Sequence, residues 1–151
     1  MKPQNITISQ NSETLAQAFA EYFAQKADEA IRARGCFLAV LSGGRTPLKA
    51  YRLLAQEPLK SQVEWEKVHF FWGDERFVPH DDQHSNFYQA KDALLDYVNI
   101  PAENLHPLPT HLSVDEAVDA YRRTLDSFAE ASQKHTRFDL VLLGLGDDGH
   151  T

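Results

Sequence analysis

Three stretches of the sequence combine glycine with side chains that can bind an anion or transfer a proton. They are Ser42-Gly43-Gly44-Arg45-Thr46-Pro47, Gly73-Asp74-Glu75-Arg76-Phe77-Val78-Pro79 and Gly144-Leu145-Gly146-Asp147-Asp148-Gly149-His150-Thr151. Each stretch directly follows an apolar run that is typical of a buried strand. The residue types indicate two kinds of chemistry, phosphate binding and proton transfer near neutral pH.

The first stretch is expected to join a strand to the beginning of a helix. Free backbone N–H groups and the positive end of the helix dipole favour a phosphate at such a place, and glycine allows the backbone to come close to it. Ser42, Gly43, Gly44, Arg45 and Thr46 are therefore candidate substrate-binding residues. The loop is not a Walker A sequence, because no lysine follows in the required place. A tight turn that binds nothing is the alternative.

The second stretch places two carboxylates and a guanidinium after an aromatic strand. Arg76 can hold a phosphate or a carboxylate through two parallel hydrogen bonds, and Asp74 can orient the ligand or accept a proton. The alternative is a solvated turn in which these charges form a local ion pair.

The third stretch matches the G-x-G-x-x-G pattern of dinucleotide-binding loops in Gly144 to Gly149. We reject that interpretation, because Asp147 and Asp148 would stand where the loop must approach a pyrophosphate and because no helix or ribose-binding acid follows. The informative part is Asp148-Gly149-His150. Histidine is the side chain best suited to proton transfer near neutrality, and the neighbouring carboxylate of Asp148 could orient it.

Other kinds of site have little support in the sequence. His80 and His84 have the i, i+4 spacing of a metal-binding pair, but no third ligand lies at a suitable distance and the segment has no helical pattern, so we expect no metal. There is no G-x-S-x-G motif, and Cys36 opens a strand away from the loops, so covalent nucleophilic catalysis has no candidate.

Strands and helices alternate along the chain, and these elements must position the three stretches. Buried strands are expected over residues 36–41 and 68–72 and from Phe138, with short strands over 5–9 and 105–108. One helix is expected from Ser12, its N-cap, to Gly35, and a second begins at Pro47, with Thr46 as cap and with Leu48, Tyr51 and Leu54 facing inward. A third helix is expected from Asn86, with Phe87, Ala90, Leu94 and Tyr97 at helical spacing. A fourth follows the Ser113–Glu116 capping box, with Val118, Tyr121, Leu125 and Phe128 on its buried side. This alternation predicts a single α/β domain over residues 1–151, built on a doubly wound, mainly parallel sheet. In such a sheet all three stretches lie at one edge, where a binding crevice forms.

The composition of the chain limits the classes of partner that can be expected. The chain has 151 residues, 42% of them hydrophobic, and a net charge of −7 with scattered basic residues, so neither nucleic acid nor an anionic membrane is an expected partner. No stretch approaches the roughly 20 apolar residues of a membrane span. The single cysteine, Cys36, excludes an internal disulfide and agrees with a reducing compartment, so we expect a cytoplasmic location.

Taken together and in this order, the three stretches and the Ser85-Asn86 pair resemble the 6-phosphogluconolactonase family, from about residue 5 to residue 151. The resemblance implies a three-layer, modified Rossmann-like fold and hydrolysis of 6-phospho-D-glucono-1,5-lactone to 6-phosphogluconate in the oxidative pentose phosphate pathway, with no required cofactor. It implies that His150 is the general base and that Arg76 contacts the substrate phosphate. We add as a hypothesis that the Ser42–Thr46 loop also binds the phosphate, that Asp148 orients His150, and that Asp74 and Asn86 support the site.

Two alternatives stay open. Glucosamine-6-phosphate deaminase shares the first glycine loop and the Asp-Gly-His turn, but its pattern has an aromatic residue after Asp-Glu, so Arg76 with Val78-Pro79 favours the lactonase. A non-catalytic sugar-phosphate-binding module is the other alternative. Family members continue past the Asp-Gly-His-Thr turn, so the resemblance implies that the C-terminal part of the domain is missing from these 151 residues and leaves their activity in isolation open. The sequence does not indicate an oligomeric state.

Overall fold

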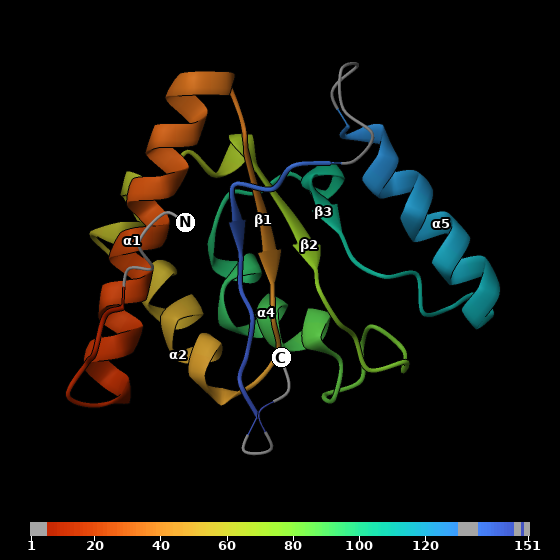
Figure 1. Cartoon of the computed structure of the whole chain (residues 1–151), viewed down its shortest axis with the longest axis horizontal. Helices are drawn as coiled ribbons and strands as arrows, with labels where there is room; N and C mark the ends of the chain where they lie inside the picture. Colours follow the sequence, from red (N-terminus) through yellow and green to blue (C-terminus); the bar gives the residue numbers. More distant parts are fainter. Residues whose placement is uncertain (1–5, 130–135, 147–148, 150–151) are drawn as a thin grey trace.

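A four-stranded parallel sheet forms the centre of the molecule (Figure 1). The computed structural model describes residues 6–129, 136–146 and 149. The strands are β1 (Phe37–Leu41), β2 (Val68–Trp72), β3 (Leu105–His106) and β4 (Leu140–Val141), in the spatial order β3-β2-β1-β4. All three pairings are parallel, with Phe37 opposite Val68 and Leu41 opposite Trp72 in the central pair. The predicted α/β fold with a parallel sheet is confirmed.

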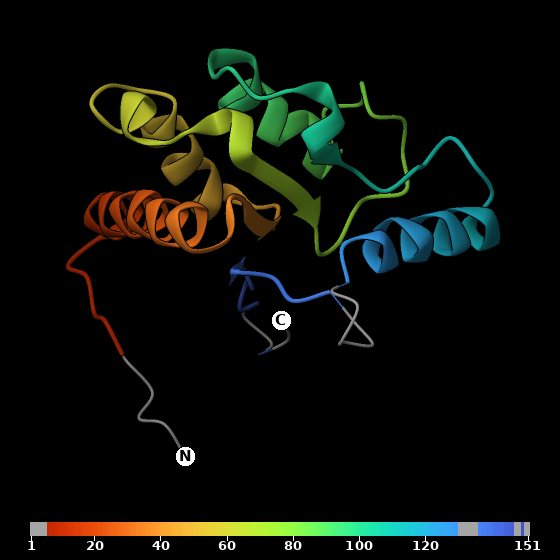
Figure 2. The same ribbon diagram turned by 90° about the horizontal axis from the view of Figure 1, so that it is seen from above.

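Helices cover both faces of this sheet. They are α1 (Ser12–Arg34), α2 (Arg45–Leu54), α3 (Leu59–Gln62), α4 (Asn86–Ala93) and α5 (Val114–Ser127), with short 3-10 turns at Trp65–Lys67, Leu95–Tyr97 and Ala102–Asn104. The larger core cluster joins α1, α2 and α4 to one face of the sheet, and a smaller cluster of Leu38, Val40 and Phe71 meets Leu125 and Phe128 on the other. Figures 1 and 2 show α1 and α5 on opposite sides of the strands. The doubly wound arrangement follows from this placement.

The central strands are apolar because both of their faces are covered. Every residue of β1 is buried, as are all but His69 in β2. Phe23 of α1 meets Phe37 of β1 edge to face, with ring centroids 5.2 Å apart, and lies 6.0 Å from the ring of Phe70. Removing such side chains from water contributes about 1.5–3 kcal/mol each, so this cluster is a main source of the sheet's stability. None of the helices in the described part of the chain combines the length and apolarity that a membrane crossing requires.

Two of the predicted helix starts are confirmed and two are wrong. α4 begins at Asn86 after the cap Ser85, and the capping box of Ser113 with Glu116 opens α5. In α1 the cap is Asn11, not Ser12, because the Asn11 side chain accepts from the backbone N–H of Thr14 at 2.8 Å. α2 begins at Arg45 after Gly44 rather than at Pro47, and no side chain caps it.

The structure also corrects the prediction of two short strands and of two side chains at helical spacing. Residues 6–9 form no strand, and Ile6 and Ile8 are 81% and 91% exposed, because an alternating pair of isoleucines does not hold a strand without a partner. β3 is two residues long, not four. Tyr97 lies beyond the end of α4 at Ala93 and is exposed, and Val118, expected on the buried side of α5, is 52% exposed.

β4 is the weakest of the strands predicted as buried. It contains only Leu140 and Val141, and Val141 is 48% exposed. Its only described partner is β1, so one of its edges has no neighbour in the described ranges. A strand that pairs on one side buries less of its surface, which explains why this apolar run does not form a long interior strand like β1.

Candidate functional site

The strand order creates a switch point between β1 and β4. From β1 the chain runs to β2 and then to β3 on one side, whereas β4 lies on the other side of β1. The strand order reverses between β1 and β4, and such a reversal marks the crevice beyond the carboxyl ends of the strands where open α/β sheets bind ligands. The loop 42–47 follows β1 and the segment 142–146 follows β4, so both lie at this crevice.

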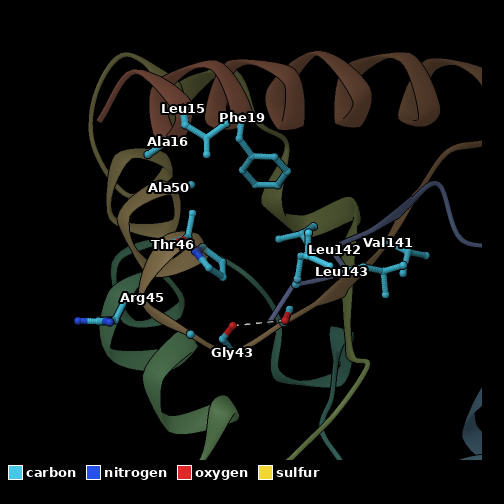
Figure 3. Close-up of a pocket in the computed structure, with 15 residues that line it drawn as sticks. Leu15, Ala16, Phe19, Gly43, Arg45, Thr46, Ala50, Val141, Leu142 and Leu143 are labelled. Carbon is cyan, nitrogen blue, oxygen red and sulfur yellow. Dashed lines mark hydrogen bonds between the residues drawn. The ribbon is translucent and has the colours of Figure 1, made fainter. Parts of the chain in front are cut away.

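A pocket of about 530 Å³ occupies the crevice (Figure 3). Its polar side is the loop from Ser42 to Pro47, and residues 141–145 face that loop from β4. Leu15, Ala16 and Phe19 of α1 with Ala50 of α2 complete the wall, and Phe19 points toward Leu142. The Arg45 side chain points away from β4 in this view. The pocket therefore offers backbone groups of the loop on one side and apolar side chains on the other.

A second pocket of about 420 Å³ brings the three predicted stretches together. It is lined by Ser42 of the first stretch, Gly73 and Asp74 of the second, and residues 142–146, which run into the third. Ser42 lines both pockets, so the two cavities adjoin at the end of β1. The prediction that these stretches meet at one edge of the sheet is confirmed for their described residues.

The first turn of α2 is open toward the larger pocket. Its cap, Gly44, has φ of 104°, a value that side chains other than glycine rarely adopt, and it offers no capping side chain. The N–H groups of Arg45 and Thr46 find no acceptor within the described ranges, and Pro47 has no N–H. Two free donors and the positive helix end thus lie at the pocket wall, an arrangement suited to a phosphate.

The buried side chain of Asn86 contacts both the first and the second stretch. Its side chain is buried, and its Nδ2 donates to the backbone oxygen of Asp74 at 3.1 Å and to the Asp74 carboxylate at 3.2 Å. The same amide lies against Gly43, so closely that a β-carbon added there would be 2.0 Å from Oδ1. Asn86 lines neither pocket, so its position suits holding the loops rather than touching a ligand.

Arg76 is exposed and lies outside both pockets. Its guanidinium forms no ion pair within the part of the chain that the structure describes. The neighbouring Glu75 carboxylate instead accepts hydrogen bonds from the start of α4. The ion pair that the alternative interpretation expected in this turn is therefore absent among the described residues, although the exposure of Arg76 agrees with a solvated turn.

Two tyrosines that sequence reasoning did not place at the site hold the strand ends. The Tyr51 hydroxyl donates to the backbone oxygen of Ser42 at 2.9 Å and accepts from its N–H at 3.3 Å. The Tyr121 hydroxyl does the same for Trp72, at 2.9 and 3.0 Å. Burial raises the pKa of Tyr51, and it raises that of Tyr121 to about 12, so both remain protonated donors. Helical spacing indicated that both side chains face inward, but it could not show the hydroxyl contacts.

The predicted acid–base pair lies outside the described residues. This applies to both Asp148 and His150. Between them, Gly149 has φ of 84°, and its N–H donates to the backbone oxygen of Gly146 at 2.9 Å. Gly149 therefore has a backbone conformation that favours glycine, and its N–H lies next to Gly146, which lines the second pocket.

His80 and His84, the pair with metal-ligand spacing, each have a local partner. His80 Nε2 is 2.6 Å from the backbone oxygen of Leu108, and His84 contacts Asp82 through Nδ1 at 2.8 Å. Over residues 6–129, 136–146 and 149 no three His, Cys, Asp or Glu side chains gather in a way that could hold a metal ion.

Comparison with known proteins gives consistent matches along the whole chain. A protein named 6-phosphogluconolactonase from Synechocystis sp. is 42% identical over 154 aligned residues, which cover 100% of this chain and 62% of that protein. A rice protein (Oryza sativa subsp. japonica) named probable 6-phosphogluconolactonase 3, chloroplastic, is 41% identical over 96% of this chain and 46% of its own length. The chain thus spans about half to three fifths of these relatives.

Solved structures agree with this result. The 6-phosphogluconolactonase of Trypanosoma brucei superposes with a TM-score of 0.84 at 31% identity, covering 98% of this chain and 62% of that one. A monomeric glucosamine-6-phosphate deaminase gives a TM-score of 0.72 at 18% identity, over 82% of this chain and 51% of its own, which shows a shared fold alone. The sequence pattern of the family described as glucosamine-6-phosphate isomerases/6-phosphogluconolactonase matches residues 10–151. The chain therefore belongs to the glucosamine-6-phosphate isomerase/6-phosphogluconolactonase family.

Proposed function

We propose that this chain carries the substrate crevice of an enzyme that hydrolyses 6-phospho-D-glucono-1,5-lactone to 6-phosphogluconate. The observation that carries the proposal is the convergence of Ser42, Asp74 and residues 142–146 on one pocket at the switch point of the sheet. Relatives that bear the name 6-phosphogluconolactonase and match the whole chain at about 40% identity support the same activity.

A lactone is an activated ester, so its hydrolysis needs few groups. The enzyme must hold the sugar phosphate, position a water, take a proton from that water and stabilise the oxyanion that forms. In our proposal the free N–H groups of Arg45 and Thr46 and the Arg76 guanidinium bind the phosphate. His150 takes the proton, Asp148 orients His150, and the crevice excludes bulk water from the reacting carbon.

The remaining residues support the bound substrate. Asp74 lines the smaller pocket and Asn86 holds Asp74 in place. Since the mechanism uses side-chain and backbone donors and one base, it requires no cofactor. The location remains the cytoplasm in this proposal, in line with the single cysteine.

The test of the proposal is lactone opening by the purified protein, corrected for spontaneous hydrolysis, in the wild type and in His150→Ala. Loss of a general base should reduce kcat on the order of a hundredfold or more. His111→Ala is the matched control, because His111 is exposed and forms none of the contacts described above.

Two results would refute the proposal in different ways. Activity of His150→Ala within a few-fold of the wild type would exclude His150 as the base. Release of ammonia from glucosamine 6-phosphate without lactone opening would assign the chain to the deaminase branch of the family.

A further inference from the structure

Among the described carboxylates near the site, Glu75 makes the most hydrogen bonds. Its Oε1 accepts from the N–H of Asn86 at 2.6 Å and from that of Arg76 at 2.7 Å. Its Oε2 accepts from the N–H of Phe87 at 3.0 Å and from the Ser85 hydroxyl, also at 3.0 Å. A half-buried carboxylate with four donors is held in one place.

These bonds close the N-terminus of α4. The first two N–H groups of the helix, those of Asn86 and Phe87, go to Glu75, and the third, that of Tyr88, goes to the Ser85 hydroxyl at 3.2 Å. The charge of Glu75 also lies at the positive end of the helix dipole, where an anion is stabilised. α4 therefore has an internal anion, whereas the N–H groups of Arg45 and Thr46 in α2 have no acceptor among the residues that the structure describes.

The same contacts fix the turn that precedes α4. Glu75 follows Asp74 and precedes Arg76, so a carboxylate anchored on α4 fixes the backbone between them. The hydrogen bond from the Arg76 N–H fixes the backbone at Arg76. Asn86 donates its N–H to Glu75 and its side-chain amide to the Asp74 carboxylate, so Glu75 also fixes Asp74 through Asn86. Because its carboxylate is occupied in this way, Glu75 does not pair with the Arg76 guanidinium, which is left available for an external anion.

We propose that Glu75 is the positioning residue of the substrate-binding turn, residues Gly73 to Pro79. Its carboxylate anchors this turn to α4 and thereby fixes the positions of Asp74 and Arg76. It also leaves the Arg76 guanidinium available for the substrate phosphate. The proposal rests on the lactonase function proposed above. Glu75 acts through its neighbours, and it does not touch the substrate.

The contact set requires a carboxylate. Three of the four partners are backbone N–H groups, which can only donate, and the amide of glutamine has one accepting oxygen and one donating NH2 group. In Glu75→Gln the NH2 group must therefore face at least one of these N–H groups, so at least one hydrogen bond is lost and two donors are brought together.

The decisive measurement separates KM from kcat for lactone hydrolysis in Glu75→Gln. We expect KM to rise at least about tenfold with kcat within about threefold of the wild type, because in our proposal the turn binds substrate while the base, His150, belongs to a different stretch of the sequence. A purely structural role would lower the active fraction, and thereby kcat, with KM unchanged. Glu64→Gln is the control, since it removes the same charge from an exposed pair with Lys67. A KM within about twofold of the wild type in folded Glu75→Gln overturns the proposal.

A second variant covers the case in which Glu75→Gln does not fold. Ser85→Ala removes one of the four donors to Glu75, together with the hydroxyl that accepts from the Tyr88 N–H, and leaves the other three donors in place. KM should therefore rise in the same direction but less, by about two- to fivefold. An unchanged KM in Ser85→Ala would then overturn the proposal.

Amide hydrogen exchange tests the anchor without substrate. The N–H groups of Asn86 and Phe87 occupy helix positions that have no acceptor within the helix, so their protection reports on Glu75. We expect their exchange to accelerate at least about tenfold in Glu75→Gln but not in Glu64→Gln. Faster exchange in a protein that neither opens the lactone nor binds 6-phosphogluconate refutes the proposed function and, with it, the substrate-positioning role. Lactone opening with an unchanged KM refutes the positioning role alone.

Discussion

Replacing Gly43 by alanine tests the contact that joins the first two loops of the site. The added β-carbon would lie 2.0 Å from Oδ1, 2.5 Å from Cγ and 2.9 Å from Nδ2 of Asn86. All three distances are below any contact that real β-carbons make, so the Asn86 amide or the loop backbone must move.

The Asn86 amide cannot move at no cost. The residue is 5% exposed, and its Nδ2 holds Asp74 through bonds of 3.1 and 3.2 Å. Overpacking a close contact costs about 1–3 kcal/mol, and each hydrogen bond given up adds roughly 0.5–1.5 kcal/mol. We expect Gly43→Ala to lower the free energy of unfolding by about 2–4 kcal/mol and to weaken substrate binding, because the loop and Asp74 both shift.

A double-mutant cycle with Asn86→Ala identifies the source of this loss. Urea unfolding of the wild type, both single variants and the double variant gives four free energies, provided that unfolding is two-state. Alanine at position 86 removes the atoms that the new methyl group meets. Gly43→Ala should therefore cost at least about 1 kcal/mol less in the Asn86→Ala background than in the wild type.

Additive costs would contradict this reasoning. If the two substitutions add to within about 0.5 kcal/mol, the methyl group does not act through Asn86, and the loss has another origin such as the loop backbone. Gly44→Ala is a useful comparison, because nothing lies within 4 Å of its β-carbon and its φ of 104° provides the only strain. Its cost should not depend on Asn86.

Two further predictions concern the tyrosine and histidine contacts. Tyr121→Phe removes the hydroxyl that binds both the N–H and the carbonyl of Trp72, so the free energy of unfolding should fall by about 1–3 kcal/mol. Tyr97→Phe is the control at an exposed ring, and in the same urea titration it should change the free energy of unfolding by less than about 0.5 kcal/mol. Burial lowers the pKa of His69, and burial with the charge of His69 lowers that of His106 to about 4. Below about pH 6.5, the ordinary pKa of histidine, the unfolded chain therefore binds more protons than the folded one. The contribution of the pair to the free energy of unfolding should be fully present above that pH and should fall as the pH drops toward the lowered pKa of His106, about 4. Each histidine contributes at most about 1.4 kcal/mol per pH unit, and less here because both rings are partly exposed. Unfolding at several pH values checks this, and an unaltered pH dependence in His106→Gln would exclude the pair as its cause.

Local patterns in the sequence were sufficient for the architecture. The continuous apolar runs at residues 36–41 and 68–72 correspond to β1 and β2, because a strand that is covered on both faces has no polar side. The Ser113 capping box gave the start of α5, because it acts within four consecutive residues. Predictions failed where the outcome depended on partners, as for the residues before α1, which have no neighbouring strand, and for β4 at the edge.

In the candidate site, too, local patterns could be predicted from the sequence whereas contacts between distant residues could not. Because the ends of parallel strands share an edge, the sequence predicted that the loops after β1, β2 and β4 converge, and Ser42, Asp74 and residues 142–146 do line one pocket. Sequence reasoning did not find Glu75 as the partner of α4, since its partners there lie ten to twelve positions further along the chain and no spacing rule links them.

The sequence by itself determined the fold class, the family and the places where polar loops interrupt buried strands, because these depend on periodicity and on short-range motifs. The tertiary structure alone decided that β4 lies beside β1, which puts the crevice at their junction. It also decided that the N-terminus of α4 is closed by Glu75 while that of α2 stays open. Both outcomes depend on contacts between residues far apart in the chain, whose distances are set only when the helices pack on the sheet.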